Sequence, residues 1–152
     1  SNSHADSLAE LLDASPDAEL WNVRLRPGKH YGFGFIGACP LLALPGNPVA
    51  AFVGFELLGS AAIARLAGKS DSVRLTTAKT SEPLTGDLGR TDAIRGFFSV
   101  DENGQQWVRP TANRGSGAVS TLFEANCIIL LPESVASVAS GAAVEILPVG
   151  YQ

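Results

Sequence analysis

The chain has 152 residues and a formal net charge of −4 at pH 7; 45% of its residues are hydrophobic and only 17% are charged. This length fits one ordinary domain or two small ones, and the composition predicts a packed core and excludes a disordered chain. The acidic balance argues against a nucleic-acid partner, which normally requires a basic surplus. All eleven Lys and Arg residues lie between Arg24 and Arg114, so a local cationic site can still exist.

The N-terminal part of the chain predicts a short helix and two strands. The helix is expected over Leu8–Ala14, before the proline at position 16. Residues 21–26 alternate apolar and polar side chains, which predicts a strand with Trp21, Val23 and Leu25 on one face. A Pro-Gly turn then leads into a second alternating strand over Tyr31–Ile36.

The next stretch predicts a strand, a tight turn and a long helix. Leu41–Leu44 is a short apolar run, which predicts a central strand covered on both faces. Asn47 is a favoured N-cap residue, and Pro48 suits the first helical position. The helix is expected to run over Pro48–Ala67 and to end at a capping glycine. Its sequence is so apolar that burial nearly all round is predicted.

From about residue 70 the hydrophobic period changes from helical to strand-like. Val73–Thr77 is expected to be a strand, residues 93–101 and 105–110 a hairpin, and Thr121–Glu124 a single helical turn. Cys127–Leu131 predicts a buried strand, and a last strand carries Val144 and Ile146 inward.

These elements predict two units. Residues 1–69 are expected to be part of an α/β domain, a parallel or mixed sheet with one long buried helix. Residues 70–152 are expected to form a small all-β, barrel-like domain. The first unit would leave much apolar surface uncovered, so further sequence or a partner chain is expected to cover it.

The sequence does not favour a membrane protein or a disulfide-bonded one. Residues 41–64 are apolar, but the Pro-Gly-Asn-Pro break leaves only Val49–Ala64 as candidate helix, which is shorter than the roughly 20 residues that a bilayer needs. Cys39 and Cys127 are expected to be buried free thiols of a reducing cytosol. No Cys/His cluster suggests a zinc site. A soluble protein without bound structural metal is therefore expected.

A first candidate anion site combines a cationic turn with the start of the long helix. Arg24, Arg26, Lys29 and His30 surround Pro27-Gly28, and Arg and Lys are the side chains that bind phosphate. The free N–H groups after the turn of residues 45–48 can also face an anion. Surface cations on a strand edge, joined to an ordinary strand-to-helix connector, would explain the same residues.

A second candidate site lies in the C-terminal half. It consists of Arg90, Arg95 and Ser116, with Arg109 and Arg114 nearby in sequence. The Gly-rich segment 114–117 could supply backbone N–H groups to an anion. Solvated arginines and a plain glycine loop explain these residues equally well.

Acidic residues offer no catalytic set. Glu56 is expected to be buried within the helix, and Asp87 and Asp92 are expected in loops. A metal-assisted transfer needs carboxylates to hold the metal, and no credible Ser-His-Asp or Cys-His arrangement is found around the one usable histidine. The chain is therefore expected to hold an anion rather than to carry out chemistry.

Four segments occur in the order of a known family. Leu44–Ala51, followed by Phe55–Leu57, resembles the LPGNPVSA…FEL signature of the molybdopterin molybdenumtransferase family, which includes bacterial MoeA and the C-terminal region of gephyrin. Arg26–Lys29, followed by Gly32–Gly34, resembles its RPGKP…FG segment. Residues 89–95 and 115–126 resemble its C-terminal domain. The likeness runs from about Trp21 to Val149.

The resemblance implies the last step of molybdenum cofactor synthesis, in which molybdate is inserted into adenylylated molybdopterin with Mg²⁺ assistance and the adenylate is hydrolysed. It also implies a cytoplasmic homodimer whose cleft lies between the α/β domain of one subunit and the C-terminal domain of the other. The residues that would bind the molybdopterin fall into two sets. Arg26, Lys29, Pro45 and Pro48 would line the cleft, with Gly46 and Asn47 of the same turn; Arg90 and Ser116 would come from across the dimer, with Arg95 as a further candidate.

The chain departs from the family at several points. Asn22 stands where some members carry lysine, and the family's GGxSxG loop and acidic residues are absent. The chain has no Met, and Ser1-Asn2-Ser3 resembles an expression scar. A C-terminal piece of a longer protein, inactive by itself, is therefore expected.

Two other functions remain open from the sequence. One is a scaffold module that binds a peptide, as in gephyrin. The other is a generic phosphate- or nucleotide-binding α/β fragment, although the chain has neither a Walker-type loop nor a G-x-G-x-x-G turn after a strand.

Overall fold

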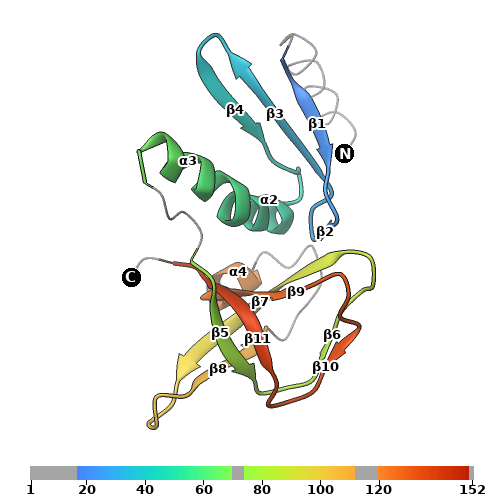
Figure 1. Ribbon diagram of the computed structural model, residues 1–152, viewed down its shortest axis with the longest axis vertical. Helices are drawn as coiled ribbons and strands as arrows, with labels where there is room; N and C mark the ends of the chain where they lie inside the picture. The colour runs from blue at the N-terminus through green and yellow to red at the C-terminus, as the bar shows by residue number, and fades with distance from the viewer. Residues whose placement is uncertain (1–16, 70–73, 112–119, 151–152) are drawn as a thin grey trace.

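The N-terminal part of the chain forms an antiparallel sheet in the computed structural model, which describes residues 17–69, 74–111 and 120–150 (Figure 1). Strands β1 (Glu19–Asn22), β3 (His30–Ile36) and β4 (Cys39–Ala43) lie in the order β1-β3-β4. Both pairings are antiparallel, so the predicted parallel or mixed sheet is wrong for this unit. A two-residue turn joins β3 to β4, and only antiparallel strands can be joined so closely. The predicted helix over Leu8–Ala14 lies outside the described residues.

The apolar run Leu41–Leu44 was expected to be a central strand covered on both faces, and this expectation is also wrong. Most of the run lies in β4, which is an edge strand of the described sheet. Ala43 is buried, while Leu41 and Leu42 are half-buried. An apolar run alone does not tell an edge strand from a central one, because the partner that covers it comes from elsewhere in the chain.

The single strand predicted over residues 21–26 is divided between two sheets. Trp21 lies in β1 and stacks on Phe33 of β3, with 5.6 Å between the ring centroids. The chain then leaves this sheet, and β2 (Leu25–Arg26) pairs in parallel with β7 of the C-terminal unit. The Val23 N–H donates to the Lys29 carbonyl at 2.9 Å, which closes the loop between them. This division carries Arg26 to the C-terminal unit.

One continuous helix follows β4, as predicted. It consists of α2 (Pro48–Gly54), a π-helical turn η1 (Phe55–Gly59) and α3 (Ser60–Leu66). The Asn47 side chain accepts hydrogen bonds from the backbone N–H groups of residues 49 and 50, which confirms the predicted N-cap. At the other end Gly68 has a φ of 73°, and the last carbonyls accept bonds from residues 68 and 69. The helix therefore ends in a Schellman motif.

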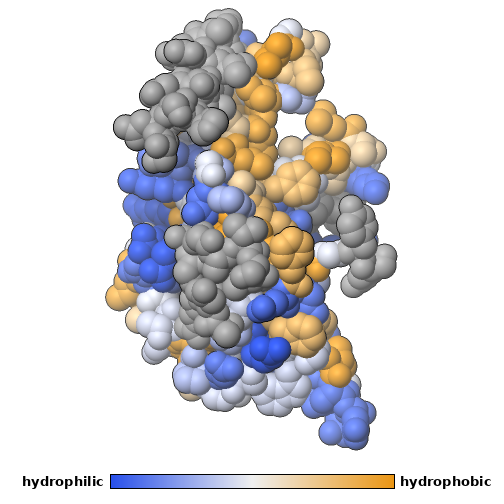
Figure 2. All heavy atoms as spheres, turned by 180° about the vertical axis from the view of Figure 1, so that it is seen from behind, coloured by the Kyte–Doolittle hydropathy of each residue, from blue (hydrophilic) through white to orange (hydrophobic). Residues whose placement is uncertain are grey.

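The expected burial of this helix on nearly all sides is not observed. Only 28% of its most apolar stretch is buried, and Leu66 is 71% exposed. By length and composition alone the segment Pro48–Leu66 could cross a membrane, a test that the core helix of a soluble protein also passes. Glu56, expected to be buried, is half-buried. Figure 2 shows hydrophobic residues gathered over the half of the molecule that the sheet and helix form.

The C-terminal part forms a closed five-stranded barrel, which confirms the barrel-like prediction. The strands that close it are β5 (Thr76–Thr80), β7 (Thr91–Val100), β8 (Gln106–Pro110), β9 (Cys127–Leu131) and β11 (Ala143–Pro148). Their order is β7-β8-β5-β11-β9, and β9 pairs back to β7. A short pair, β6 (Leu84–Thr85) with β10 (Ser137–Val138), and the helical turn α4 (Ser120–Glu124) complete the unit.

Several barrel elements follow the sequence closely. The predicted β7–β8 hairpin is present, and Asp101 accepts bonds in its turn from the N–H groups of residues 103 and 105. Val144 and Ile146 are buried as expected. The first strand begins three residues later than predicted, at Thr76. Cys127 is buried, but Cys39 is exposed, which corrects the expectation that both thiols are buried.

An apolar cluster joins the helix to the barrel. Val53 of α2 is fully buried with Ala93 of β7, Ile128 of β9 and Leu147 of β11. Leu25, directly before Arg26, packs against the same cluster. The two units therefore share part of their core, and this contact fixes where β2 lies on the barrel.

Candidate functional site

Arg26 of β2 lies against Asp92 of β7, where the two-residue strand β2 pairs in parallel with the start of β7. Its Nε donates to one carboxylate oxygen at 2.5 Å, and its Nη2 donates to the other at 2.7 Å. The register of the two strands places the residues directly opposite each other. This two-bond arrangement is the strongest geometry between a guanidinium and a carboxylate.

Asp92 is the acidic residue whose role sequence reasoning missed. It lies in a strand rather than in the predicted loop, and its side chain is 2% exposed. A third donor, the backbone N–H of Asp87, reaches its Oδ2 at 2.8 Å. A buried carboxylate needs such partners, because an unpaired charge in the interior is costly. The available signal was its place directly before the predicted strand over residues 93–101, which in the structure begins earlier, at Thr91.

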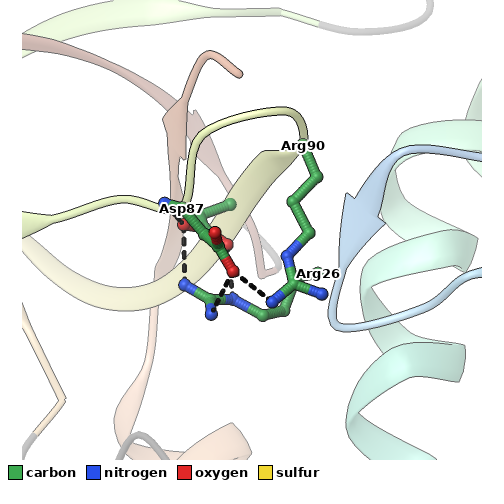
Figure 3. Close-up of polar contacts among 4 residues, drawn as sticks. Arg26, Asp87 and Arg90 are labelled. Carbon is green, nitrogen blue, oxygen red and sulfur yellow. Dashed lines mark hydrogen bonds and ion pairs between the residues drawn. The ribbon is translucent and has the colours of Figure 1, made fainter. Parts of the chain in front are cut away.

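Asp87 connects two arginines. Its Oδ2 accepts a bond from Arg26 Nη1 at 3.2 Å and a second, short one from Arg90 Nη2 (Figure 3). All three guanidinium nitrogens of Arg26 therefore donate hydrogen bonds to two carboxylates. Unlike Asp92, the Asp87 side chain is 43% exposed, as is that of Arg90. The outer part of this network is in contact with water, and the inner part is not.

A cleft of about 470 Å³ lies beside this network. Its walls come from β2 and the following turn, from β7, and from the ends of β6 and β8. The lining residues are Arg26, Pro27, Thr85, Asp92, Ala93, Ile94, Arg95 and Thr111. Arg95 is 4% exposed, and burial lowers the pKa of its guanidinium from the ordinary value. An arginine remains charged after such a shift, so the cleft has two cationic side chains, Arg26 paired with Asp92 and the buried Arg95, on a partly apolar wall.

The turn after Arg26 separates the cleft from the start of the long helix. Pro27 lines the cleft, whereas Gly28 packs against Tyr31 and Ala50. Gly28 has a φ of 106°, and a Cβ there would lie 2.3 Å from the Tyr31 hydroxyl oxygen. Only glycine therefore fits at this position.

The predicted site residues are distributed unevenly. Arg26 and Arg95 line the cleft, and Arg90 reaches Arg26 through Asp87 within one chain. Lys29 is exposed on the turn, and Pro45, Gly46, Asn47 and Pro48 form the start of the helix. None of these five lines the cleft in the described part of the chain. Ser116, and Arg114 with it, lie outside the described residues.

The described residues do not fit a Mg²⁺ site at this cleft. No group of three His, Cys, Asp or Glu side chains comes together in residues 17–69, 74–111 and 120–150. The two carboxylates beside the cleft, those of Asp87 and Asp92, are already paired with arginines. Mg²⁺ prefers free carboxylate oxygens and water, so no step is assigned to a metal on these residues.

Comparisons with known proteins agree with this fold. Residues 77–149 match the family model of the MoeA C-terminal region, domain IV. A molybdopterin molybdenumtransferase of Haemophilus influenzae is 32% identical over 97% of this chain, and one of Mycobacterium tuberculosis is 30% identical over 93%. The chain spans 37% and 35% of those two relatives.

A solved structure supports the same fold. A molybdopterin biosynthesis MoeA protein from Pyrococcus horikoshii matches 97% of this chain with a TM-score of 0.78 at 24% identity, and the chain covers 36% of that structure. The barrel and its preceding sheet and helix therefore share the fold of part of that MoeA protein. Residues 77–149 belong to the family of the MoeA C-terminal region, and the chain as a whole is similar to about a third of each molybdopterin molybdenumtransferase that it matches.

Proposed function

We propose that the cleft between β2 and β7 binds the anionic part of molybdopterin during molybdenum cofactor biosynthesis. The observation that carries this proposal is that Arg26 and Arg95, from different units, line one cleft of about 470 Å³. Ala93 and Ile94 contribute apolar lining to the same cleft. Charged donors beside an apolar surface suit a ligand with an aromatic ring system and a phosphate.

In the whole protein, the reaction would be insertion of molybdate into adenylylated molybdopterin, with hydrolysis of the adenylate. The relatives carry the name of this transferase. Arg95 would stabilise negative charge on the ligand, and its burial strengthens that interaction because little water screens it. Asp92 is held by Arg26 and by a backbone N–H, so it orients groups rather than removing a proton. The chain by itself would bind and orient the ligand but would not turn it over.

The remaining parts of the assignment are proposals of the same kind. The boundary between an α/β domain and the C-terminal β domain would lie at residues 69 and 70. Lys29 and the helix start at Pro45–Pro48 would belong to a second part of the ligand cleft, completed in a homodimer. Mg²⁺ would be held by residues beyond this chain, and the protein would act in the cytoplasm.

A peptide-binding module as in gephyrin is not favoured by the hollow at the far end of the barrel. That hollow, of about 530 Å³, lies beside the β7–β8 hairpin and is lined by polar residues: Thr76, Thr77, Asn103, Gly104, Gln105 and Gln106. An apolar groove, which a peptide's side chains need, is not formed there.

The test is an activity assay on the whole protein with adenylylated molybdopterin, molybdate and Mg²⁺, which follows release of the adenylate. Arg95→Ala is expected to lower kcat/KM by about 100-fold, because a buried donor to developing charge is lost. Arg95→Lys, which keeps the charge, should recover part of that loss. Lys79→Ala is the matched control, since Lys79 is an exposed cation on β5 that does not line the cleft.

The 152-residue chain should show no turnover in the same assay. Turnover by this chain alone would contradict the proposal that it binds the ligand but does not catalyse the reaction by itself. Equal activity of the Arg95→Ala and Lys79→Ala proteins would contradict the proposed role of the cleft.

A further inference from the structure

Two guanidinium groups converge on one oxygen of Asp87. Arg26 comes from β2 and Arg90 from the segment before β7, and both donate to Asp87 Oδ2 (Figure 3). Two guanidinium groups that converge on one oxygen can also hold a phosphate or a similar oxyanion, because arginine forms strong charge-assisted hydrogen bonds with both carboxylate and phosphate oxygens. Here a carboxylate of the chain itself occupies that place.

One of the two arginines is held in position without Asp87. Arg26 makes two bonds to the buried carboxylate of Asp92, which is 2% exposed at its side chain. Its Nη1 group therefore keeps its direction whether or not Asp87 is beside it. The backbone of Asp87 is also fixed, because its N–H donates to Asp92. Only the carboxyl group of Asp87 has to move for another anion to reach the two guanidinium groups.

The contacts that Asp87 would give up are weak ones. Its side chain is 43% exposed, and those of its partners Arg26 and Arg90 are 45% and 43% exposed. Exposed ion pairs contribute little, because water competes for both charges and two side chains must be held still. The buried pair between Arg26 and Asp92 is a much stronger arrangement. The buried Arg26–Asp92 pair is therefore expected to stay in place, whereas the exposed contacts of Asp87 can be replaced by a ligand.

We propose that Asp87 is a tethered competitor of the ligand: its carboxylate fills an oxyanion subsite made by Arg26 and Arg90, and a tetrahedral dianion displaces it. This inference rests on the proposed function, because it describes how the same site selects its anionic group. A monoanion gains little over the carboxylate already present, whereas a dianion has twice the charge for the two guanidinium groups. The subsite would thus reject chloride and small carboxylates in favour of a phosphate group or molybdate.

The test is calorimetric titration of the 152-residue chain with inorganic phosphate and with molybdate, at one fixed ionic strength. Asp87→Asn is expected to tighten binding of the preferred dianion by about 3- to 10-fold, the range that one or two exposed pairs allow. Glu145→Gln removes the same charge from an exposed position on β11 and should leave the affinity unchanged. The dianion that binds more tightly identifies the group that the subsite takes, either the phosphate monoester that the pterin carries once the adenylate is hydrolysed or molybdate.

A double-variant cycle separates this subsite from a general effect of charge. In an Arg90→Ala background, Asp87→Asn should no longer tighten binding, because the second guanidinium is gone. The same gain in both backgrounds, or an equal gain with Glu145→Gln, would overturn the proposal. If molybdopterin binds but Asp87→Asn does not change the affinity for the dianion, only this inference is contradicted. If Asp87→Asn tightens dianion binding as expected but molybdopterin does not bind, the proposed function is contradicted and the oxyanion subsite is still supported.

Discussion

At the scale of single residues, the buried carboxylate of Asp92 organises the cleft. It holds the Arg26 guanidinium by two bonds and the loop at Asp87 by a third. The three donors come from both units, so one side chain links the sheet-and-helix part to the barrel. Its charge is tolerated inside because every bond it accepts is short and charge-assisted or comes from the backbone.

Asp92→Ala is expected to destabilise the chain by about 1–3 kcal/mol, because Arg26 and the Asp87 N–H both lose a partner. The cost stays moderate, since Arg26 is 45% exposed and water can reach it. Urea unfolding measures the change. Glu133→Ala, which breaks the exposed pair with Arg24, should stay within about 0.5 kcal/mol. Equal costs for the two variants would contradict the role given to Asp92.

The two thiols should differ in reactivity. Burial raises the pKa of the Cys127 thiol to about 12, while Cys39 is exposed. Because the thiolate is the reactive form, Cys127 should not react with a thiol reagent at about pH 8. Titration with an aromatic disulfide should find one reactive thiol in the native chain and two after denaturation. Two reactive thiols in the native chain would show that β9 is not buried as described.

At the scale of elements, local signals were predictable and pairings were not. Asn47, Pro48 and Gly68 mark the ends of the long helix, and the β7–β8 hairpin follows from its turn residues, because these signals act over a few residues. The antiparallel sheet, the passage of β2 to the barrel and the pairing of Arg26 with Asp92 were missed. The last two join segments far apart in sequence, and for all three the alternation of side chains does not specify the partner strand or its direction.

The helix packs on Tyr31 through a glycine. A Cβ at Gly54 would lie 2.3 Å from the Tyr31 ring. Gly54→Ala should therefore destabilise the chain by about 1–2 kcal/mol, because an overpacking cost of about 1–3 kcal/mol exceeds the gain of up to about 1 kcal/mol in helix propensity. Thermal unfolding checks this. Gly46→Ala is the control, since a Cβ there meets nothing within 4 Å. A stabilised Gly54→Ala protein would contradict this packing.

Glu56 in the π-helical turn should make stability depend on pH. Burial raises the pKa of its carboxyl group above the ordinary value. Because the folded state favours the protonated carboxyl group, its contribution to the free energy of unfolding is fully present below the pKa of the unfolded chain. That contribution is lost as the pH rises through the pKa of the folded chain. Glu56→Gln should therefore raise Tm at pH 7 and leave it unchanged below about pH 4. The same shift at both pH values, or a shift with the exposed Glu145→Gln, would contradict this.

At the scale of the whole molecule, a shared core and a polar network hold two units in one arrangement. Val53, Ile128 and Leu147 join helix to barrel on one side, and the Arg26–Asp92 pair joins β2 to β7 nearby. The cleft lies at this junction, so its shape depends on both units. Apolar surface of the sheet and helix is exposed (Figure 2), and the chain spans about a third of the relatives that it matches.

Fluorescence titration of molybdopterin against the 152-residue chain tests the central claim most directly, with Arg95→Ala and Lys79→Ala measured beside it. Saturable binding is predicted, at least about tenfold weaker in Arg95→Ala, because a charged hydrogen bond contributes about 1.5–3 kcal/mol. Lys79→Ala should bind as the unaltered chain does. The same affinity in all three folded proteins, or no binding by any of them, would contradict a ligand cleft between β2 and β7.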